Sequence, residues 1–294
     1  MTIPAGDYAK FPQSPPGDRY AVIGHPVEHS KSPLIHAAFA KQTRQELSYQ
    51  ALLAPLDGFA DTVRIFRASG GRGANVTVPF KLEACSLATR LTERAKVAGA
   101  VNTLTFNGDI IVGDNTDGVG LVRDLLNNLN CPLAGRHVLL LGAGGAARGV
   151  MLPLLHARPT VLTVANRNIE RAHELRETFA PHAGQTAFTA GNFEGLEGWE
   201  FDVVINATSA SLENKVPSLP NGLFAPDAFV YDMMYGAGET PFLVWARAAG
   251  VTRLADGLGM LVEQAAESFA LWRGVRPNSA AVLSRLRGKL AART

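Results

Sequence analysis

Short apolar runs alternate with amphipathic stretches from residue 20 onward. The first series of runs predicts five strands, over residues 20–24, 47–53, 74–78, 101–106 and 110–112. Helices are expected between them, including one over residues 33–41 and one that begins at Lys81. The last two strands flank Asn107-Gly108, which predicts a hairpin because both residues tolerate positive φ. Strands that alternate with helices favour βαβ units and a mainly parallel sheet.

A second alternating series begins near Arg136. It predicts buried strands over residues 137–141, 160–165, 201–205 and 228–232. Residues 119–129 have apolar side chains at helical spacing and are expected to bridge the two series. After Gly257 a long helical pattern carries Leu261, Ala265, Phe269 and Trp272 on one face, and we expect it to pack on the first domain. The sequence therefore predicts two α/β domains with a cleft between them, formed by residues 20–117 plus 257–294 and by residues 118–256.

Length, charge and cysteine content exclude several classes of protein. A chain of 294 residues suits about two domains of roughly 150 residues each. The net charge is +2 and the basic residues are scattered, which argues against a nucleic-acid partner. Residues 1–19 are rich in Pro and Gly and lack an apolar core, so we interpret them as a flexible leader. Two cysteines without metal or redox spacing, and no long apolar run, predict a cytoplasmic protein without membrane contact. We expect a monomer or homodimer.

A glycine-rich segment in the second half indicates a dinucleotide site. Residues 137–149 read as an apolar strand, a turn and a helix. In a Rossmann-like domain Gly142 permits the tight turn, and Gly144 lets the backbone approach a pyrophosphate at the positive end of the helix. The turn residues expected to contact the cofactor are Gly142, Ala143, Gly144, Gly145 and Ala146. A tight strand-to-helix connection without a ligand is the alternative, and the flanking strand and helix favour nucleotide binding.

The end of the next strand predicts which dinucleotide binds. A site selective for NAD places Asp or Glu there, to accept hydrogen bonds from the ribose. This chain has Asn166, Arg167 and Asn168, with Arg171 one turn into the next helix. Guanidinium groups suit a 2′-phosphate, although arginine is also common on solvated helix starts. We therefore expect NADP.

Polar clusters in the first half fall where strands end. The first contains Ser30 and Ser32-Pro33, and we expect Ser32 to be the N-cap of the following helix. Such hydroxyls also suit a carboxylate. His25, Glu28 and His29 match the spacing of a zinc-peptidase motif, which requires a helix. Because Gly24 and Pro26 put these residues on a loop, no metal is expected.

The other clusters contain groups that suit acid–base chemistry. Asn75 and Thr77 share one face of a strand, and Pro79 ends that strand just before Lys81. Asn102 is an amide within a predicted strand. Asp117 precedes the bridging helix, where an N-cap role is a sufficient explanation. Each of these residues taken alone is more often structural than catalytic.

Taken in order, these segments resemble the shikimate dehydrogenases. The similarity includes Gly-His-Pro-Val-x-His-Ser30-Lys-Ser32-Pro, Asn75-Val-Thr77-Val-Pro-Phe-Lys81, Gly99-Ala-Val-Asn102-Thr, Asn-Thr-Asp117-Gly, Gly142-Ala-Gly-Gly-Ala, Asn206-Ala-Thr-Ser, Tyr231-Asp-Met233-x-Tyr235 and Asp256-Gly257-Leu-Gly-Met-Leu-Val-x-Gln264-Ala-Ala. It covers nearly the whole chain after the leader. The chain departs from the family at Asn168, where the family has Thr, and at Ser211, where it often has Gly.

The resemblance implies an NADP-dependent oxidoreductase that interconverts 3-dehydroshikimate and shikimate in chorismate and aromatic amino-acid biosynthesis. It implies Lys81 and Asp117 as the acid–base pair, meeting across a pocket that faces the reactive ring of the dinucleotide. The implied substrate ligands are Ser30 and Ser32 for the carboxylate and Thr77, Asn102, Asp117 and Gln264 for the hydroxyls, with Tyr235 close by. Met233 and Gly257 would line the nicotinamide side, and Glu93 would lie near the cofactor. Two alternatives remain: a quinate/shikimate dehydrogenase that uses NAD(P), and a non-catalytic NADP-binding regulator.

Overall fold

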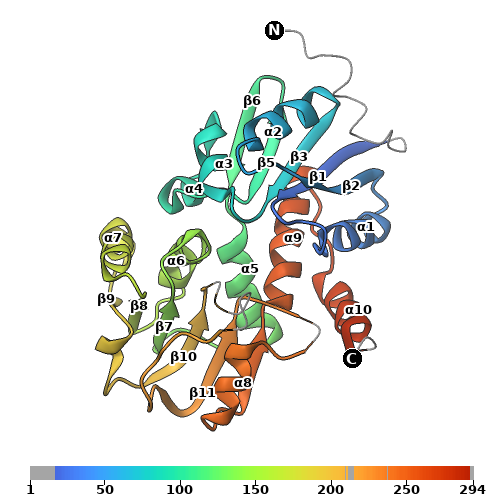
Figure 1. Ribbon diagram of the computed structural model, residues 1–294. Coiled ribbons are helices and arrows are strands. Elements are labelled where there is room, and N and C mark those ends of the chain that lie inside the picture. Colours follow the sequence, from blue (N-terminus) through green and yellow to red (C-terminus); the bar gives the residue numbers. More distant parts are fainter. Residues whose placement is uncertain (1–16, 209, 211–214, 237, 292–294) are drawn as a thin grey trace. The chain divides into compact units, whose positions relative to one another are not determined.

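The computed structural model describes residues 17–208, 210, 215–236 and 238–291, which form two compact units. The first contains described residues 17–116 and Ala265–Val282, and the second contains Asp117–Gln264 and described residues 283–291. Each unit has its own six-stranded sheet (Figure 1). The predicted boundaries fall after residues 117 and 256, whereas those of the compact units fall after residues 116, 264 and 282. Ser211, where the chain departs from the family, lies outside the described residues.

The sheet of the first unit has the strand order β2-β1-β3-β5-β6-β4. Its strands are β1 Asp18–Gly24, β2 Leu47–Leu53, β3 Gly71–Val76, β4 Arg90–Leu91, β5 Thr103–Asn107 and β6 Ile110–Asp114. β1 pairs parallel with β2 and β3, and β4 with β6, whereas β5 runs antiparallel to both β3 and β6. Parallel pairing therefore predominates. Both antiparallel pairs involve β5, which forms the predicted hairpin with β6.

Several boundaries of the first unit differ from the predictions. Asp18 and Arg19, which we assigned to the leader, begin β1. β3 ends at Val76 because a turn follows, in which the Phe80 amide donates to the carbonyl of Thr77 at 3.1 Å. In the hairpin only Gly108 has positive φ, at 56°, since Asn107 still belongs to β5 and pairs with Ile110.

Four helices accompany this sheet: α1 Ser32–Thr43, α2 Phe59–Ala68, α3 Lys81–Leu87 and α4 Glu93–Ala98. α2 carries Phe59, Val63 and Phe66 on its buried face, where they join Val76 and Leu104 of the sheet in one apolar core. The Phe59 ring stacks on Phe80 with ring centroids 4.9 Å apart. This stack fixes the segment that leads into α3, whose first residue is Lys81.

The second unit contains a fully parallel sheet in the order β12-β11-β10-β7-β8-β9. Its strands are β7 His137–Leu141, β8 Val161–Ala165, β9 Ala187–Gly191, β10 Phe201–Asn206, β11 Phe224–Asp232 and β12 Arg253–Asp256. Its helices are α5 Asp117–Arg123, α6 Gly145–His156, α7 Ile169–Phe179 and α8 Pro241–Ala248, with short 3-10 turns at Ala180–His182 and Glu194–Leu196. The chain passes from β7 outward to β9 and then returns to β10 on the other side of β7. The carboxyl end of β7 is therefore a topological switch point, where open α/β sheets bind ligands.

The bridging segment and the last part of the described chain are helical. The predicted bridging helix consists of α5 followed by a π-helical turn, η2, over Asp124–Asn128. α9 Leu258–Arg273 supplies residues to both units, because the boundary falls after Gln264, and α10 Ser279–Ala291 follows it. Among the described residues, none of the helices is long and apolar enough to span a membrane.

Candidate active site

The glycine turn after β7 has the geometry that a dinucleotide requires. Gly142 has a φ of 105°, which favours glycine, and its amide donates to the Ala165 carbonyl at 2.7 Å. α6 then begins at Gly145 with Gly144 as its N-cap. A Cβ at Gly144 would meet no described atom within 4 Å, so the backbone there is open to a ligand. This open turn lies at the amino end of a 12-residue helix, where amides and the helix dipole attract phosphate.

The residues after β8 present two unpaired arginines. Asn168 is the N-cap of α7, and its Oδ1 accepts from the Arg171 amide at 2.9 Å. The Asn166 side chain donates to the Asn168 carbonyl at 2.8 Å, which stiffens the turn. The guanidinium groups of Arg167 and Arg171 are exposed and have no hydrogen-bond or ion-pair partner within the described part of the chain. A 2′-phosphate fits this arrangement, because neither cation has to leave a carboxylate to bind it.

The ends of β10, β11 and β12 bring Met233 and Gly257 together. The Met233 amide donates to the Asn206 carbonyl at 2.9 Å, and the Gly257 amide donates to the Met234 carbonyl at 2.9 Å. A Cβ at Gly257 would lie 2.1 Å from the carbonyl oxygen of Met233, so the two segments meet only because residue 257 is glycine. Two residues after Met233, burial and the nearby Asp256 carboxylate raise the pKa of Tyr235. The two residues predicted for the nicotinamide side are thus adjacent.

In the first unit, the polar clusters gather at one edge of the sheet. The Ile23–Val76 and Asn75–Thr103 pairings align the carboxyl ends of β1 and β3 with the amino end of β5. Ser30 follows β1, Thr77 and Lys81 follow β3, and Asn102 precedes β5. The backbone joins these segments, since the His25 amide donates to the Val78 carbonyl and the Thr77 amide to the Ile23 carbonyl, both at 2.9 Å.

The structure corrects the predicted cap of α1. Lys31, not Ser32, is the N-cap, because the Ile35 amide donates to the Lys31 carbonyl at 3.1 Å and closes the first helical turn. Ser32 is the first helical residue, and its amide donates to Ser30 Oγ at 3.3 Å. The Ser32 hydroxyl is therefore not used to cap the helix, and the two serines lie side by side at its amino end.

Lys81 and Asn102 are held close to each other by the backbone. The Lys81 carbonyl accepts from the Val101 amide at 2.9 Å, one residue before Asn102. Asn102 Oδ1 accepts from the Thr116 amide at 2.8 Å, and Asn102 Nδ2 donates to Thr116 Oγ1 at 2.9 Å. These two bonds fix Thr116, the residue that immediately precedes Asp117 along the chain.

Asp117 is buried and is the first residue of α5, not its N-cap. It belongs to the second compact unit, whereas Lys81 belongs to the first. Their meeting as an acid–base pair stays a prediction. Gln264 is also buried in the second unit, and its Nε2 donates to the Leu261 carbonyl at 2.9 Å. Glu93, predicted near the cofactor, is exposed in the first turn of α4.

An ion-pair network supports the strand that leads to Asp117. Arg94 donates to both oxygens of Asp114, at 2.6 and 2.8 Å, and to Glu267 at 3.2 Å. Burial by itself would raise the pKa of Asp114, but the Arg94 guanidinium outweighs this effect and lowers the pKa. Sequence reasoning missed Arg94, because its partners are 20 and 173 positions away along the chain.

The residues that match a zinc-peptidase spacing lie on a loop, as expected. His25 Nδ1 is 2.8 Å from the Ala54 carbonyl, and the Glu28 carboxylate accepts from the Val27 amide at 3.1 Å. His29 is exposed. In the part of the chain that the structure describes, no three His, Cys, Asp or Glu side chains gather as metal ligands.

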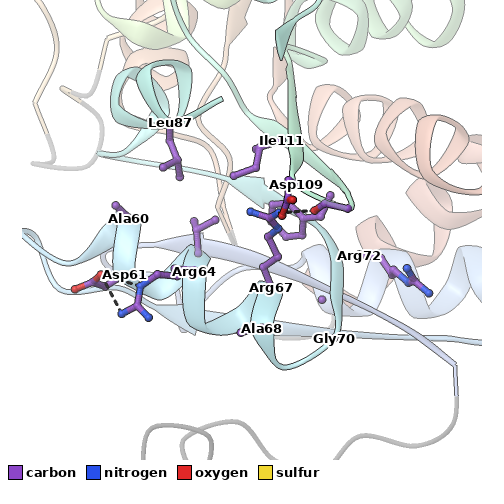
Figure 2. Close-up of a pocket in the computed structure, with 14 residues that line it drawn as sticks. Ala60, Asp61, Arg64, Arg67, Ala68, Gly70, Arg72, Leu87, Asp109 and Ile111 are labelled. Carbon is purple, nitrogen blue, oxygen red and sulfur yellow. Dashed lines mark hydrogen bonds and ion pairs between the residues drawn. The ribbon is translucent and has the colours of Figure 1, made fainter. Parts of the chain in front are cut away.

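A large cavity lies at the opposite end of β3 from the predicted site. It has a volume of about 800 Å³ and is lined by residues of α2, the start of β3 and the β5–β6 hairpin. Figure 2 shows the Arg67 side chain paired with Asp109 and that of Arg64 paired with Asp61. None of the predicted site residues lines this cavity, so it is separate from the chemistry considered above.

Comparison with known proteins identifies the family. The model of the shikimate dehydrogenase substrate binding domain matches residues 22–104, that of shikimate/quinate 5-dehydrogenase matches residues 124–214, and that of the shikimate 5′-dehydrogenase C-terminal domain matches residues 257–287. The shikimate dehydrogenase (NADP(+)) of Aromatoleum aromaticum is 65% identical over 273 residues, covering 93% of this chain and 98% of the relative. The chain belongs to the shikimate dehydrogenase family.

Solved structures, among them a shikimate dehydrogenase, share the fold. The Thermus thermophilus enzyme in complex with NADP(H) and shikimate has a TM-score of 0.80 and 32% identity, covering 93% of this chain and 99% of that one. An Ael1 enzyme from Pseudomonas putida reaches a TM-score of 0.84 with 51% identity, covering 92% of this chain and 98% of its own. These comparisons confirm the predicted family and the predicted α/β fold with a Rossmann-like domain.

Proposed function

We propose that this chain catalyses the reversible NADPH-dependent reduction of 3-dehydroshikimate to shikimate, a step of chorismate and aromatic amino-acid biosynthesis. The observation that carries the proposal is the gathering of Ser30, Thr77, Lys81 and Asn102 at one edge of the first sheet. A polyhydroxylated carboxylate needs such a set of hydroxyl, amide and cationic groups once water is excluded. Relatives at 56–65% identity are named shikimate dehydrogenase (NADP(+)), which supports the same activity.

NADP fits the residues of the second unit. The open turn of Gly142, Ala143, Gly144, Gly145 and Ala146 would hold the pyrophosphate, and Arg167 and Arg171 would hold the 2′-phosphate. The side-chain hydrogen bonds of Asn166 and Asn168 shape the turn after β8 that carries Arg167. Met233 and Gly257 would line the nicotinamide side, with Glu93 near the cofactor. When bound, this cofactor supplies the hydride for reduction of the ketone.

The protein's own task is to handle the proton and the charge on the reacting oxygen. In the reductive direction, the Lys81 ammonium donates a proton to the oxygen that becomes the alcohol. The Asp117 carboxylate accepts a hydrogen bond from the same hydroxyl and orients the ammonium. Ser30 and Ser32 bind the substrate carboxylate, and Thr77, Asn102 and Gln264 bind ring hydroxyls, with Tyr235 close by. Positioned acid–base catalysis of this kind contributes about 10²- to 10⁴-fold.

The proposal assigns residues 20–117 plus 257–294 to the substrate and residues 118–256 to the cofactor. It also places the protein in the cytoplasm as a monomer or homodimer that binds small molecules. The two cysteines, Cys85 and Cys131, have neither metal nor redox spacing in the sequence, which suits a reducing compartment.

A spectrophotometric assay of the purified protein tests the function. Shikimate and quinate are offered separately, each with NADP or NAD, and reduction of the nicotinamide is followed. Turnover with shikimate and NADP supports the proposal. Turnover of quinate with NAD supports the second candidate, a quinate/shikimate dehydrogenase, which the name of one matching family model favours. Cofactor binding by fluorescence without turnover of either acid points to a non-catalytic regulator.

A further inference from the structure

Asp124 lies at the centre of a buried hydrogen-bond network in the second unit. It is the first residue of the π-helical turn η2, and its side chain is buried. The Tyr231 phenol donates to Asp124 Oδ2 at 2.7 Å, and Asn128 Nδ2 donates to Asp124 Oδ1 at 2.9 Å. The carboxylate therefore joins β11, which carries Tyr231, to the segment that follows α5.

The same carboxylate lies against the first turn of α9. An ideal Cβ at Gly259 would lie 2.0 Å from Asp124 Oδ1 and 2.3 Å from Oδ2, so the two segments approach this closely only because residue 259 is glycine. A negative charge is favourable at this place, because the first amides of a helix lack partners within the helix and the helix dipole is positive at that end. Asp124 thus holds the amino end of α9 against η2.

Asn128 extends this network to the second turn of α9. Its Nδ2 also donates to Glu263 Oε1 at 3.3 Å, so one amide nitrogen directs its two protons to two carboxylates. Turning the amide over would place its oxygen against both carboxylates, which fixes its orientation. Glu263 is buried and directly precedes Gln264 along the chain. The network that begins at Asp124 therefore ends one residue from a proposed substrate ligand.

A second glycine lets α5 approach the same part of α9. An ideal Cβ at Gly120 would lie 2.7 Å from Gln264 Cβ and 2.8 Å from the Gln264 amide nitrogen. Gly120 belongs to α5, the helix that begins with Asp117. Because no side chain at position 120 separates the two helices, a shift of α9 changes the position of Gln264 relative to Asp117.

We propose that Asp124 is a positioning residue for the substrate, which it serves by holding the first two turns of α9 and with them the side-chain amide of Gln264. This inference rests on the proposed function, in which Gln264 binds a ring hydroxyl. A hydrogen bond weakens steeply as its angle departs from linearity, so a small displacement of the helix weakens the bond to that hydroxyl. Asp124 acts through α9 and is not itself a ligand.

The proposed nicotinamide side has backbone anchors of its own. The Met233 amide donates to the Asn206 carbonyl and the Gly257 amide to the Met234 carbonyl, both at 2.9 Å. Both bonds are independent of the Asp124 side chain. Loss of that side chain is therefore expected to weaken shikimate binding and to leave cofactor binding nearly unchanged.

The first test compares Asp124→Ala with Asp124→Asn. Asp124→Ala removes both hydrogen bonds, and we expect the KM for shikimate to rise about tenfold, the value of one lost hydrogen bond to a ligand, with kcat and the KM for NADP within about twofold of wild type. Asp124→Asn keeps the size of the side chain and one acceptor, so its KM for shikimate should lie closer to that of wild type. Asp202→Asn, which changes a partly exposed carboxylate of β10 paired with Arg136, is the matched control and should behave as wild type. An unchanged KM for shikimate in Asp124→Ala, or equal rises for shikimate and NADP, overturns the inference.

A double-mutant cycle separates this role from a general loss of stability. If Asp124 acts through Gln264, Asp124→Ala changes the KM for shikimate by less than about twofold in the Gln264→Ala background. Equal effects in both backgrounds overturn the inference. A rise in KM with Asp124→Ala but not with Gln264→Ala refutes the assignment of Gln264 in the proposed function, whereas a rise with Gln264→Ala alone refutes the role of Asp124.

Tyr231→Phe provides the test if Asp124→Ala does not fold. It removes one of the two hydrogen bonds to the carboxylate and keeps the buried ring, so we expect the KM for shikimate to rise about two- to fivefold. Tyr20→Phe removes the hydroxyl of another buried tyrosine, 3.5 Å from Arg273, and should keep the wild-type value. A wild-type KM for shikimate in Tyr231→Phe contradicts the proposal.

Discussion

The carbonyl oxygen of Met233 lies where a side chain at position 257 would begin, 2.1 Å from an ideal Cβ. Met233 directly follows β11, and Gly257 directly follows β12. The carboxyl ends of these neighbouring parallel strands lie at the edge of the sheet that also bears the glycine turn. A methyl group at position 257 must push the Met233 segment away. The shape of the proposed nicotinamide side therefore depends on residue 257 being glycine.

Gly257→Ala is expected to lower kcat/KM for NADP by at least about tenfold, because displacement of Met233 by about 1 Å disturbs the alignment of reacting groups. Steady-state kinetics with varied NADP measures the effect. Gly288→Ala is the matched control, since that position lies in α10 with no described atom within 4 Å of its ideal Cβ. The control should keep full activity and gain about 0.5–1 kcal/mol of stability. Equal activity of the two variants would contradict the importance of this contact.

Arg167→Ala should raise the KM for NADP by about tenfold or more and leave the KM for NAD nearly unchanged. The reason is that the guanidinium has no partner in the described protein and is available to the 2′-phosphate alone. Arg285→Ala, an exposed arginine of α10, controls for the loss of one positive charge. Equal weakening of both dinucleotides by Arg167→Ala would refute its role in cofactor selection.

Lys81→Ala should reduce kcat by about 10²- to 10⁴-fold while the Kd for shikimate changes little. The ammonium is the proposed proton donor, whereas hydroxyls and amides supply most of the binding contacts. Turnover is measured in the assay above and binding by calorimetry. Lys96→Ala, at an exposed position of α4, should behave as wild type. Near-normal turnover of Lys81→Ala would remove the residue from its assigned role.

Arg94→Ala should destabilise the protein by about 3–5 kcal/mol at pH 7, because it leaves the Asp114 carboxylate buried without its partner. The pKa of Asp114 is lowered in the folded state, so the pair stabilises the protein above the ordinary value of 3.8 and the stabilisation is lost as pH falls through the lowered pKa. The difference in free energy of unfolding between wild type and variant should therefore become smaller below about pH 4. Urea unfolding at pH 7 and pH 3 measures it. Arg64→Ala breaks an exposed pair with Asp61 and should cost at most about 1 kcal/mol.

Sequence patterns predicted the elements with strong apolar periodicity. β2 and β7 have the predicted bounds, and β1, β8, β10 and β11 differ only at their ends. β4, β9 and β12 were missed, because β4 has only two residues and the other two carry small or polar residues with little apolar signal. Their strand conformation comes from pairing with a neighbour, which local sequence does not report.

The candidate site was predictable where one short segment carries the chemistry. The turn at Gly142 and the arginine at position 167 are such cases. The hydrogen bonds that join Asn75 to Tyr49 and to Ser268 were not predicted, since these partners are 26 and 193 positions away along the chain. The cap of α1 was misplaced by one residue, because Ser32 and Lys31 are distinguished only by which carbonyl closes the first turn.

The buried amide of Asn75 accepts from Tyr49 and donates to Ser268 and Thr103, and this full set of hydrogen bonds has a thermodynamic consequence. Side chains whose hydrogen bonds are already complete within the protein lose little motion when a ligand binds. The entropic penalty of ordering protein groups is therefore small there. Affinity for a small, heavily hydrated acid then depends on how well it replaces its water shell. A compound that lacks one ring hydroxyl would meet a rigid surface that does not close around the gap.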